Sequence, residues 1–339
     1  MHKALRPFAF LLAASLASSL WAKAAYGGVE TINRDDLKAH LEFISHDLLE
    51  GRFTPSRGLD IAALYITTQL KLWGVKAGGT QGYLQPFPVR TREGQTMTSN
   101  IIGIIEGSDA KLKDEYVVVS AHYDHVGTRS DGDDQIYNGA DDNGSGTVAL
   151  LEMAQALTFG PKPKRSIMLV WFAGEERGLW GSEHMAANPP VPLDRIAALL
   201  NIDMIGRSWT PDMGEQFKGN VTPQDGIFVI GSKLMSTRLG QISEQVNKDY
   251  LQLKFDYKYD DPKDTERLFY RSDHYSFAKR GVPAIFYFDG IHPDYHQVTD
   301  ELKTIDFYKM EIVTKTIFAT AWTVAMEKEK PKVDKTLDR

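Results

Sequence analysis

The chain has 339 residues, of which 42% are hydrophobic, and a formal net charge of −6 at pH 7. This length and composition are sufficient for one large buried core. An acidic chain with no basic run argues against nucleic acids and anionic membranes as partners, and the lack of cysteine excludes disulfides and a thiol for lipid attachment.

The first 24 residues have the pattern of a secretory signal peptide. Lys3 and Arg6 make a basic start, residues 8–21 are apolar, and Ala22-Lys23-Ala24 has the small-x-small form of a cleavage site. The apolar stretch is shorter than the ~20 residues that a membrane-spanning helix needs. We therefore expect cleavage before Ala25 and a secreted or periplasmic protein, with no stable membrane association after cleavage.

The rest of the chain is predicted to form one domain. Residues 25–327 contain no internal repeat, linker or low-complexity block, whereas residues 328–339 are rich in lysine and predict a flexible tail. The oligomeric state does not follow from the sequence.

Apolar patterns then predict alternating helices and strands. Amphipathic stripes predict a helix near the mature N-terminus (Leu37, Leu41, Ile44 and Leu48) and one near the C-terminus (Met310, Val313, Ile317, Ala321 and Val324). A third helix is expected over residues 148–157. Short apolar runs predict strands, several of them buried on both faces, at 100–105, 116–119, 167–172, 198–202, 227–230 and 284–288. This alternation is typical of an α/β sandwich.

Five short segments carry acidic or histidine side chains in one order along the chain. They are residues 121–125, 139–144, 174–178, 201–204 and 295–300, and their imidazoles and carboxylates suit zinc. His122, the Glu175-Glu176 pair and Asp203 each follow or end a predicted strand. Because ligands of open α/β sheets bind outside the carboxyl ends of the strands, we expect these side chains to meet at one rim of the sheet.

The five segments closely resemble the co-catalytic zinc aminopeptidases of family M28. They contain its His-x-Asp, Gly-Ala-Asp-Asp-Asn, Gly-Glu-Glu, Asn-x-Asp-Met and Tyr-His motifs, and the likeness extends from about residue 48 to residue 301. The resemblance implies a three-layer α/β/α sandwich with a mixed, largely parallel central sheet. It also implies two Zn²⁺ ions per chain, with Asp141 bridging both, a cis peptide between Asp141 and Asp142, and five ligands: His122, Asp141, Glu176, Asp203 and His296.

The residue types fit the chemistry of such a site. Two divalent ions about 3.5–4 Å apart need a shared carboxylate, and a metal-bridged hydroxide is then the expected nucleophile. Glu175 is predicted to be the general base, beside its ligating neighbour Glu176. In members of the family a tyrosine near this site donates to the oxyanion, so Tyr295, next to the last ligand, is a candidate for that role, with a place in the pocket wall as the alternative.

Three further residues near the motifs receive predictions. Asp124 lies two residues after His122 on the same side of an extended segment, and so is predicted to accept the second N–H of that imidazole and orient it. His125 alternates to the opposite side and is predicted to be structural. His274 is a lone histidine at a helix start, and a structural role is favoured over a place beside the substrate pocket.

The leading interpretation is an aminopeptidase acting on peptides with a free N-terminus. A carboxypeptidase or dipeptidase remains open, and Arg207 and Arg271 are candidates to hold its substrate carboxylate. A glutaminyl-cyclase-like transferase would use one zinc, and a non-catalytic binding ectodomain would have lost ligands or Glu175. Residues 208–225 and 250–269 are expected to shape the pocket, and the aromatic side chains of the second segment would favour apolar N-terminal residues.

Overall fold

The computed structural model of this chain describes residues 26–92 and 94–336. The predicted signal peptide, residues 1–24, lies outside the described residues. Within the described part, no helix combines the length and the apolar character that crossing a membrane requires.

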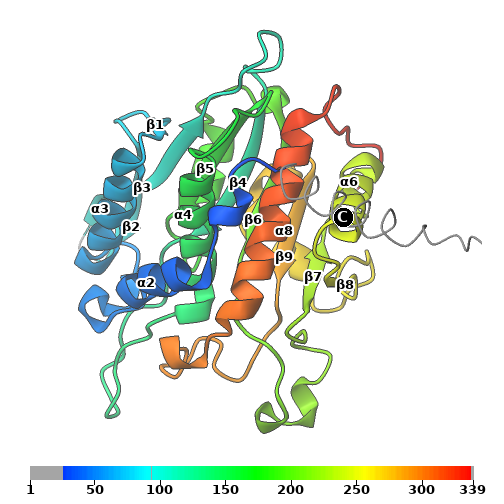
Figure 1. Cartoon of the computed structure of the whole chain (residues 1–339). Helices are drawn as coiled ribbons and strands as arrows, with labels where there is room; N and C mark the ends of the chain where they lie inside the picture. The colour runs from blue at the N-terminus through cyan, green and yellow to red at the C-terminus, as the bar shows by residue number, and fades with distance from the viewer. Residues whose placement is uncertain (1–25, 93, 337–339) are drawn as a thin grey trace, which may run out of the picture.

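A mixed sheet crosses the middle of the described chain (Figure 1). Its order is β1-β3-β5-β4-β6-β9-β7-β8, and β2 pairs with β3. The four central strands β5, β4, β6 and β9 are parallel, and the flanking strands β3 and β7 join them antiparallel. The strands are β1 (Lys76–Ala77), β2 (Leu84–Thr91), β3 (Gly94–Ile105), β4 (Tyr116–His122), β5 (Ser166–Phe172), β6 (Ile196–Ile202), β7 (Gly226–Ile230), β8 (Lys254–Asp256) and β9 (Ala284–Phe288).

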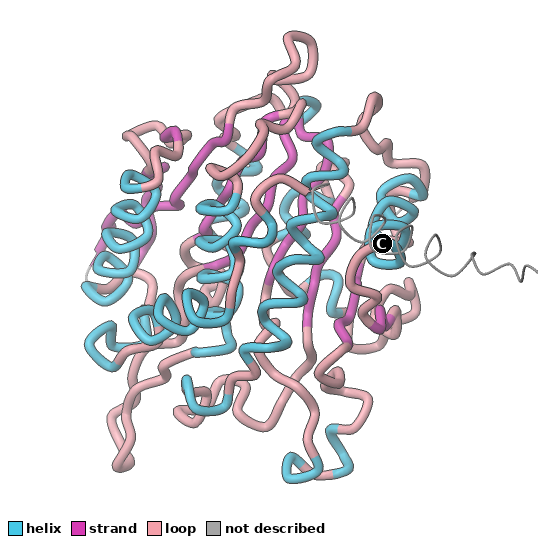
Figure 2. The backbone as a smooth tube through the Cα atoms, viewed as in Figure 1, coloured by secondary structure: helices cyan, strands magenta, loops and turns pink. Residues whose placement is uncertain are grey.

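Helices cover both faces of this sheet (Figures 1 and 2). One face packs against α2 (Arg34–Ile44), α3 (Arg57–Leu72), α4 (Gly146–Ala156), α6 (Thr237–Asp249) and α8 (Phe307–Met326), and the other against α5 (Trp180–Ala187) and α7 (His274–Ala278). Along β4, Val117 and Val119 enter the first core and Val118 enters the second, because successive side chains of a strand point to opposite faces. The predicted α/β/α sandwich is confirmed.

The predicted strands are all present, whereas the edge strands β1, β2 and β8 were not predicted. Edge strands bury less surface and so leave a weaker apolar pattern. The first amphipathic stripe is only partly correct, because α2 ends at Ile44 and Leu48 is 76% exposed. At the other end, the segment that we expected to be a flexible tail makes hydrogen bonds, for example from the Asp334 N–H to the Met235 carbonyl at 3.0 Å.

Candidate metal centre

The predicted ligands come from loops that follow the parallel strands. His122 is the last residue of β4, Glu176 lies in the loop after β5, and Asp203 follows β6 directly. His296 lies in the long loop after β9. These segments meet at the carboxyl ends of the strands, at the lower edge of the sheet in Figure 1, as the strand topology predicts.

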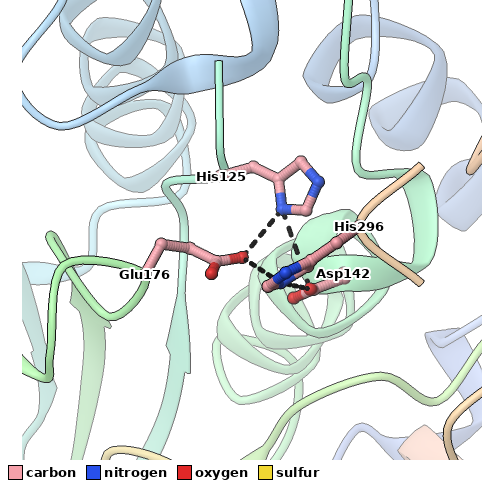
Figure 3. Close-up of side chains that lie close together, drawn as sticks. All are labelled: His125, Asp142, Glu176 and His296. Atoms are coloured by element: carbon pink, nitrogen blue, oxygen red, sulfur yellow. Dashed lines mark hydrogen bonds and ion pairs between the residues drawn. The ribbon is translucent and has the colours of Figure 1, made fainter. Parts of the chain in front are cut away.

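Two groups of potential metal ligands share one aspartate. The first group is His125, Asp142, Glu176 and His296 (Figure 3), and the second is His122, Asp142 and Asp203. Asp142 Oδ2 lies 3.0 Å from His296 Nε2, and Asp142 Oδ1 lies 3.3 Å from His122 Nε2. One carboxylate therefore faces both groups, which is the arrangement that a pair of bridged cations requires.

The structure corrects the choice between two adjacent aspartates. Asp141, which we expected to be the shared ligand, instead accepts the Gly206 N–H at 2.6 Å and faces His292 Nε2 at 3.1 Å. The cis peptide likewise lies between Asp142 and Asn143, one bond later than predicted. The motif Asp-Asp-Asn is compatible with either assignment, and only the turn of the backbone decides which carboxylate enters the centre.

Buried hydrogen bonds hold Asp142 in place. The carboxylate of Asp300 accepts the backbone N–H groups of Asp141 and Asp142 at 3.0 Å each. On the other side, Asn143 accepts the Met204 N–H and donates to the Ile202 carbonyl, which ties this loop to the end of β6. The carboxylate that faces both ligand groups is therefore fixed by its backbone as well as by its neighbours.

The predicted direction of the His125 side chain was wrong. We assumed an extended segment after His122, but β4 ends there, so the alternation of side chains does not continue. The backbone N–H of His125 donates to the backbone carbonyl of Arg52 at 3.2 Å. The buried Arg52 side chain in turn donates to the backbone carbonyls of Tyr123 and Gly139. This turn directs His125 Nδ1 to 3.0 Å from Glu176 Oε1. In the sequence, the only indication that the His125 side chain lies at this site is its closeness to His122 along the chain.

Glu175 belongs to neither ligand group, although it follows the same strand as Glu176. It lines a cleft of about 40 Å³ together with His122, Asp142 and Asp203. Burial raises the pKa of the Glu175 carboxyl well above its usual range. The two adjacent glutamates therefore occupy different places, one in a ligand group and one in the cleft.

Asp124 contacts both the predicted base and the predicted ligand. Its Oδ1 accepts the Glu175 N–H at 3.2 Å and lies 3.7 Å from His122 Nδ1. The nearer oxygen to His122 Nδ1 is the Asp124 backbone carbonyl, at 3.2 Å. The second nitrogen of His122 therefore faces Asp124, mainly through the backbone and at longer range through the carboxylate.

Tyr295 forms one wall of the same cleft. Its ring stacks on the imidazole of His296, with ring centroids 3.9 Å apart. Burial, together with the charges of Asp142 and Glu176, raises the pKa of the phenol, so its hydroxyl stays protonated and able to donate.

The two candidate arginines have different surroundings. Arg207 is buried and donates to Asp294 at 2.7 Å, with His292 at 3.2 Å, so its guanidinium is engaged inside the protein. Arg271 is exposed and lines the cleft. His274 is buried, with Phe286 stacked on its ring at 4.9 Å, and it does not line the cleft.

A larger cavity of about 570 Å³ adjoins the cleft and shares Arg271 and Tyr295 with it. Both segments that we expected to shape the pocket contribute to its wall. The wall is nevertheless more charged than the aromatic pocket that we expected; its charged residues are Lys258, Asp261, Lys263, Asp264, Glu266 and Arg271.

Comparison with known proteins identifies the family. The profile of Peptidase family M28 matches residues 100–321, which is more than half of the chain. The chain therefore belongs to peptidase family M28, and its class is that of the peptide hydrolases. A protein named probable leucine aminopeptidase from Arthroderma benhamiae is 27% identical over 308 residues, which cover 88% of this chain and 75% of that protein.

Solved structures share the fold. The aminopeptidase LapA of Legionella pneumophila superposes with a TM-score of 0.66 at 21% identity, covering 89% of this chain and 74% of LapA. A glutaminyl cyclase from an Acidobacteriales bacterium gives a TM-score of 0.65 at 22% identity, covering 88% of this chain and 96% of the cyclase. Because a peptidase and a cyclase share this fold, the reaction has to be argued from the site.

Proposed function

We propose that this protein is a secreted zinc-dependent aminopeptidase that holds two Zn²⁺ ions and releases N-terminal residues from peptides. The observation that carries the proposal is the position of Asp142, whose two carboxylate oxygens reach two separate ligand groups. Membership of family M28 and the similarity to a probable leucine aminopeptidase support the same function. A leader at residues 1–24 would deliver the chain to the periplasm or the medium.

The side chains at this rim fit bound cations. Asp142, Glu176 and Asp203 converge in largely buried surroundings, and Glu175 lies beside them. Carboxylates that are buried this close together repel one another and lose their hydration, so positive charge is needed to keep them ionised. Imidazole nitrogens and carboxylate oxygens are ligands that zinc commonly takes.

Zinc bound there would polarise the scissile carbonyl and lower the pKa of a water molecule to near neutrality. Glu175 lines the cleft and belongs to neither ligand group, which supports a role for it as the general base that would take a proton from water and give it to the leaving amine. The position of Tyr295 in the wall of the cleft supports a role for its hydroxyl as the donor that would stabilise negative charge on the carbonyl oxygen. Asp124 faces the second nitrogen of His122, which supports a role for it in orienting that ring.

A second candidate function is a dipeptidase or carboxypeptidase, and the position of Arg271 favours it. This guanidinium lines both the cleft and the adjoining cavity. An arginine in this place could pair with the carboxylate of a short peptide. In the aminopeptidase the same arginine would contact the peptide beyond the scissile bond.

The test is hydrolysis of matched substrates by the zinc-loaded protein. Leu-p-nitroanilide and a leucyl dipeptide amide offer a free amine and no carboxylate, a free dipeptide offers both groups, and an acetylated dipeptide offers only the carboxylate. An aminopeptidase cleaves the first two. Cleavage of the free dipeptide alone, with a KM that rises in Arg271→Gln, would establish the dipeptidase, and cleavage of the acetylated peptide alone would establish the carboxypeptidase.

A further inference from the structure

The four donor atoms of the first ligand group have the spacing of a complete metal site. His125 Nδ1 lies 3.0 Å from Glu176 Oε1 and 3.8 Å from Asp142 Oδ2. His296 Nε2 lies 3.0 Å from that same Asp142 oxygen and 3.1 Å from Glu176 Oε1. Four ligands in tetrahedral array about 2.0–2.1 Å from zinc are separated from one another by roughly 3.3–3.4 Å, and the observed distances bracket this value.

The second group has only three members. His122 Nε2 lies 3.3 Å from Asp142 Oδ1 and 3.3 Å from Asp203 Oδ1. The other oxygen of Asp203 accepts the Ser272 hydroxyl at 2.6 Å, which leaves one oxygen free for a metal. All three residues line the cleft, whereas the first group contributes only Asp142 to it. Zinc sites with four protein ligands are typically structural, and sites with three leave a position for water or substrate.

The contacts of the ring nitrogens indicate which atom of His125 would bind a metal. The ring is fully buried, and its Nε2 has no hydrogen-bond partner among the described residues, whereas its Nδ1 faces Glu176 Oε1 and Asp142 Oδ2. Because an imidazole binds a metal through one ring nitrogen, Nδ1 is the atom that would complete this group.

The surroundings of His125 hold it in this orientation. Its backbone is anchored on Arg52, and its ring packs directly on Gly139, where an added Cβ would lie 2.5 Å from His125 Cδ2. Gly139 itself has a φ of +56°, a conformation that side chains rarely adopt. The ring is thus placed by the fold before any cation arrives.

We propose that the two metal positions are unequal, because His125 is a fourth protein ligand of the position formed with Asp142, Glu176 and His296. This inference rests on the proposed function and extends it. The four-ligand position is closed and binds zinc more tightly. The three-ligand position of His122, Asp142 and Asp203 is open, and it faces the cleft where substrate and Glu175 meet.

The test measures metal binding and needs no activity. The metal-free protein is titrated with Zn²⁺ against a competing chelator, and bound zinc is counted by mass spectrometry. For the native chain we expect two zinc-binding steps with different dissociation constants, the tighter one at the four-ligand position. His125→Phe, which keeps a ring but has no ligating nitrogen, should weaken the tighter step at least tenfold, whereas His122→Phe should weaken the other. His274→Phe, a buried histidine outside both groups, is the matched control and should keep both steps.

Co²⁺ gives an independent readout, because tetrahedral Co²⁺ absorbs visible light more intensely than five- or six-coordinate Co²⁺. The first equivalent of Co²⁺ should give intense visible absorption in the native chain and only weak absorption in His125→Phe. If His125→Phe fails to fold, His125→Gln is the second variant. Unchanged zinc steps and an unchanged cobalt spectrum in a folded His125 variant would overturn the inference alone. A native chain that binds no zinc would overturn the proposed function as well.

Discussion

The carboxylate of Asp300 accepts a hydrogen bond from the backbone N–H of Asp142 at 3.0 Å, across 158 positions of sequence. Asp300 closes the Tyr-His-Gln-Val-Thr-Asp segment that also supplies His296, so one loop both contributes a member of a potential ligand group and holds the carboxylate that faces both groups. The position of Asp142 therefore depends on the C-terminal third of the chain.

Asp300→Ala should weaken the metal centre without removing a ligand. Two buried N–H groups would lose their acceptor, at about 1–3 kcal/mol each. We expect a lower melting temperature in the metal-free protein and zinc binding that is weaker by roughly 10–100-fold, as is typical when groups that orient ligands are lost. Thermal unfolding and chelator competition measure the two effects. Normal zinc affinity in this variant would show that Asp142 does not need this support.

Asp142→Asn and Asp141→Asn should have different effects on metal content. An amide is a poorer ligand than a carboxylate, so Asp142→Asn is expected to lose both zinc ions. Asp141→Asn disturbs the contacts with Gly206 and His292, and it should lower stability while two ions remain bound. Metal analysis after dialysis distinguishes the variants. The reverse pattern would restore Asp141 as the shared ligand.

Glu175→Gln and Glu176→Gln test the separation of base and ligand. The first should keep zinc near two per chain while kcat falls by about 10²–10⁴, the range for a lost general base. The second should weaken one zinc, and added zinc should restore part of its activity. Metal content is measured alongside turnover of Leu-p-nitroanilide. Near-normal turnover by Glu175→Gln would contradict the proposed mechanism.

His274 should make the fold sensitive to acid. Burial lowers the pKa of its imidazole to about 3, whereas in the unfolded chain it titrates near 6.5. Between these values the unfolded state binds more protons than the folded state, so the free energy of unfolding falls as the pH is lowered. The expected contribution between pH 7 and pH 4.5 is roughly 2–3 kcal/mol.

His274→Phe should therefore reduce this acid sensitivity. Denaturant unfolding of the metal-free native chain and of the variant, with chelator present, gives the free energy of unfolding of each at pH 7 and at pH 4.5. The difference between the two pH values is then calculated for each protein. Comparing the two differences removes any constant effect of the larger ring on packing. An equal pH dependence in both proteins would show that His274 is not the group responsible.

Much of the architecture followed from local patterns. The strands β4, β5 and β6 are buried on both faces and so appear as continuous apolar runs, which places them inside a parallel sheet. His122, Glu176 and Asp203 each lie at or just after the end of one of these strands. The rule that ligands bind at the carboxyl ends of such strands was therefore enough to predict that these side chains meet at one rim of the sheet. The edge strands β1, β2 and β8 were not predictable in this way, because they are more exposed and carry no such run.

The tertiary structure alone decided between neighbouring residues. Asp141 and Asp142 have the same side chain, and only the turn of the backbone, held by Asp300, directs one of them to the metal centre. His125 lies beyond the end of β4, so the period-two rule no longer applies, and its direction depends on contacts with Arg52 and Gly139. Sequence determines which side chains are available near a rim. Their final directions depend on long-range hydrogen bonds and steric contacts between segments that meet only in the folded chain.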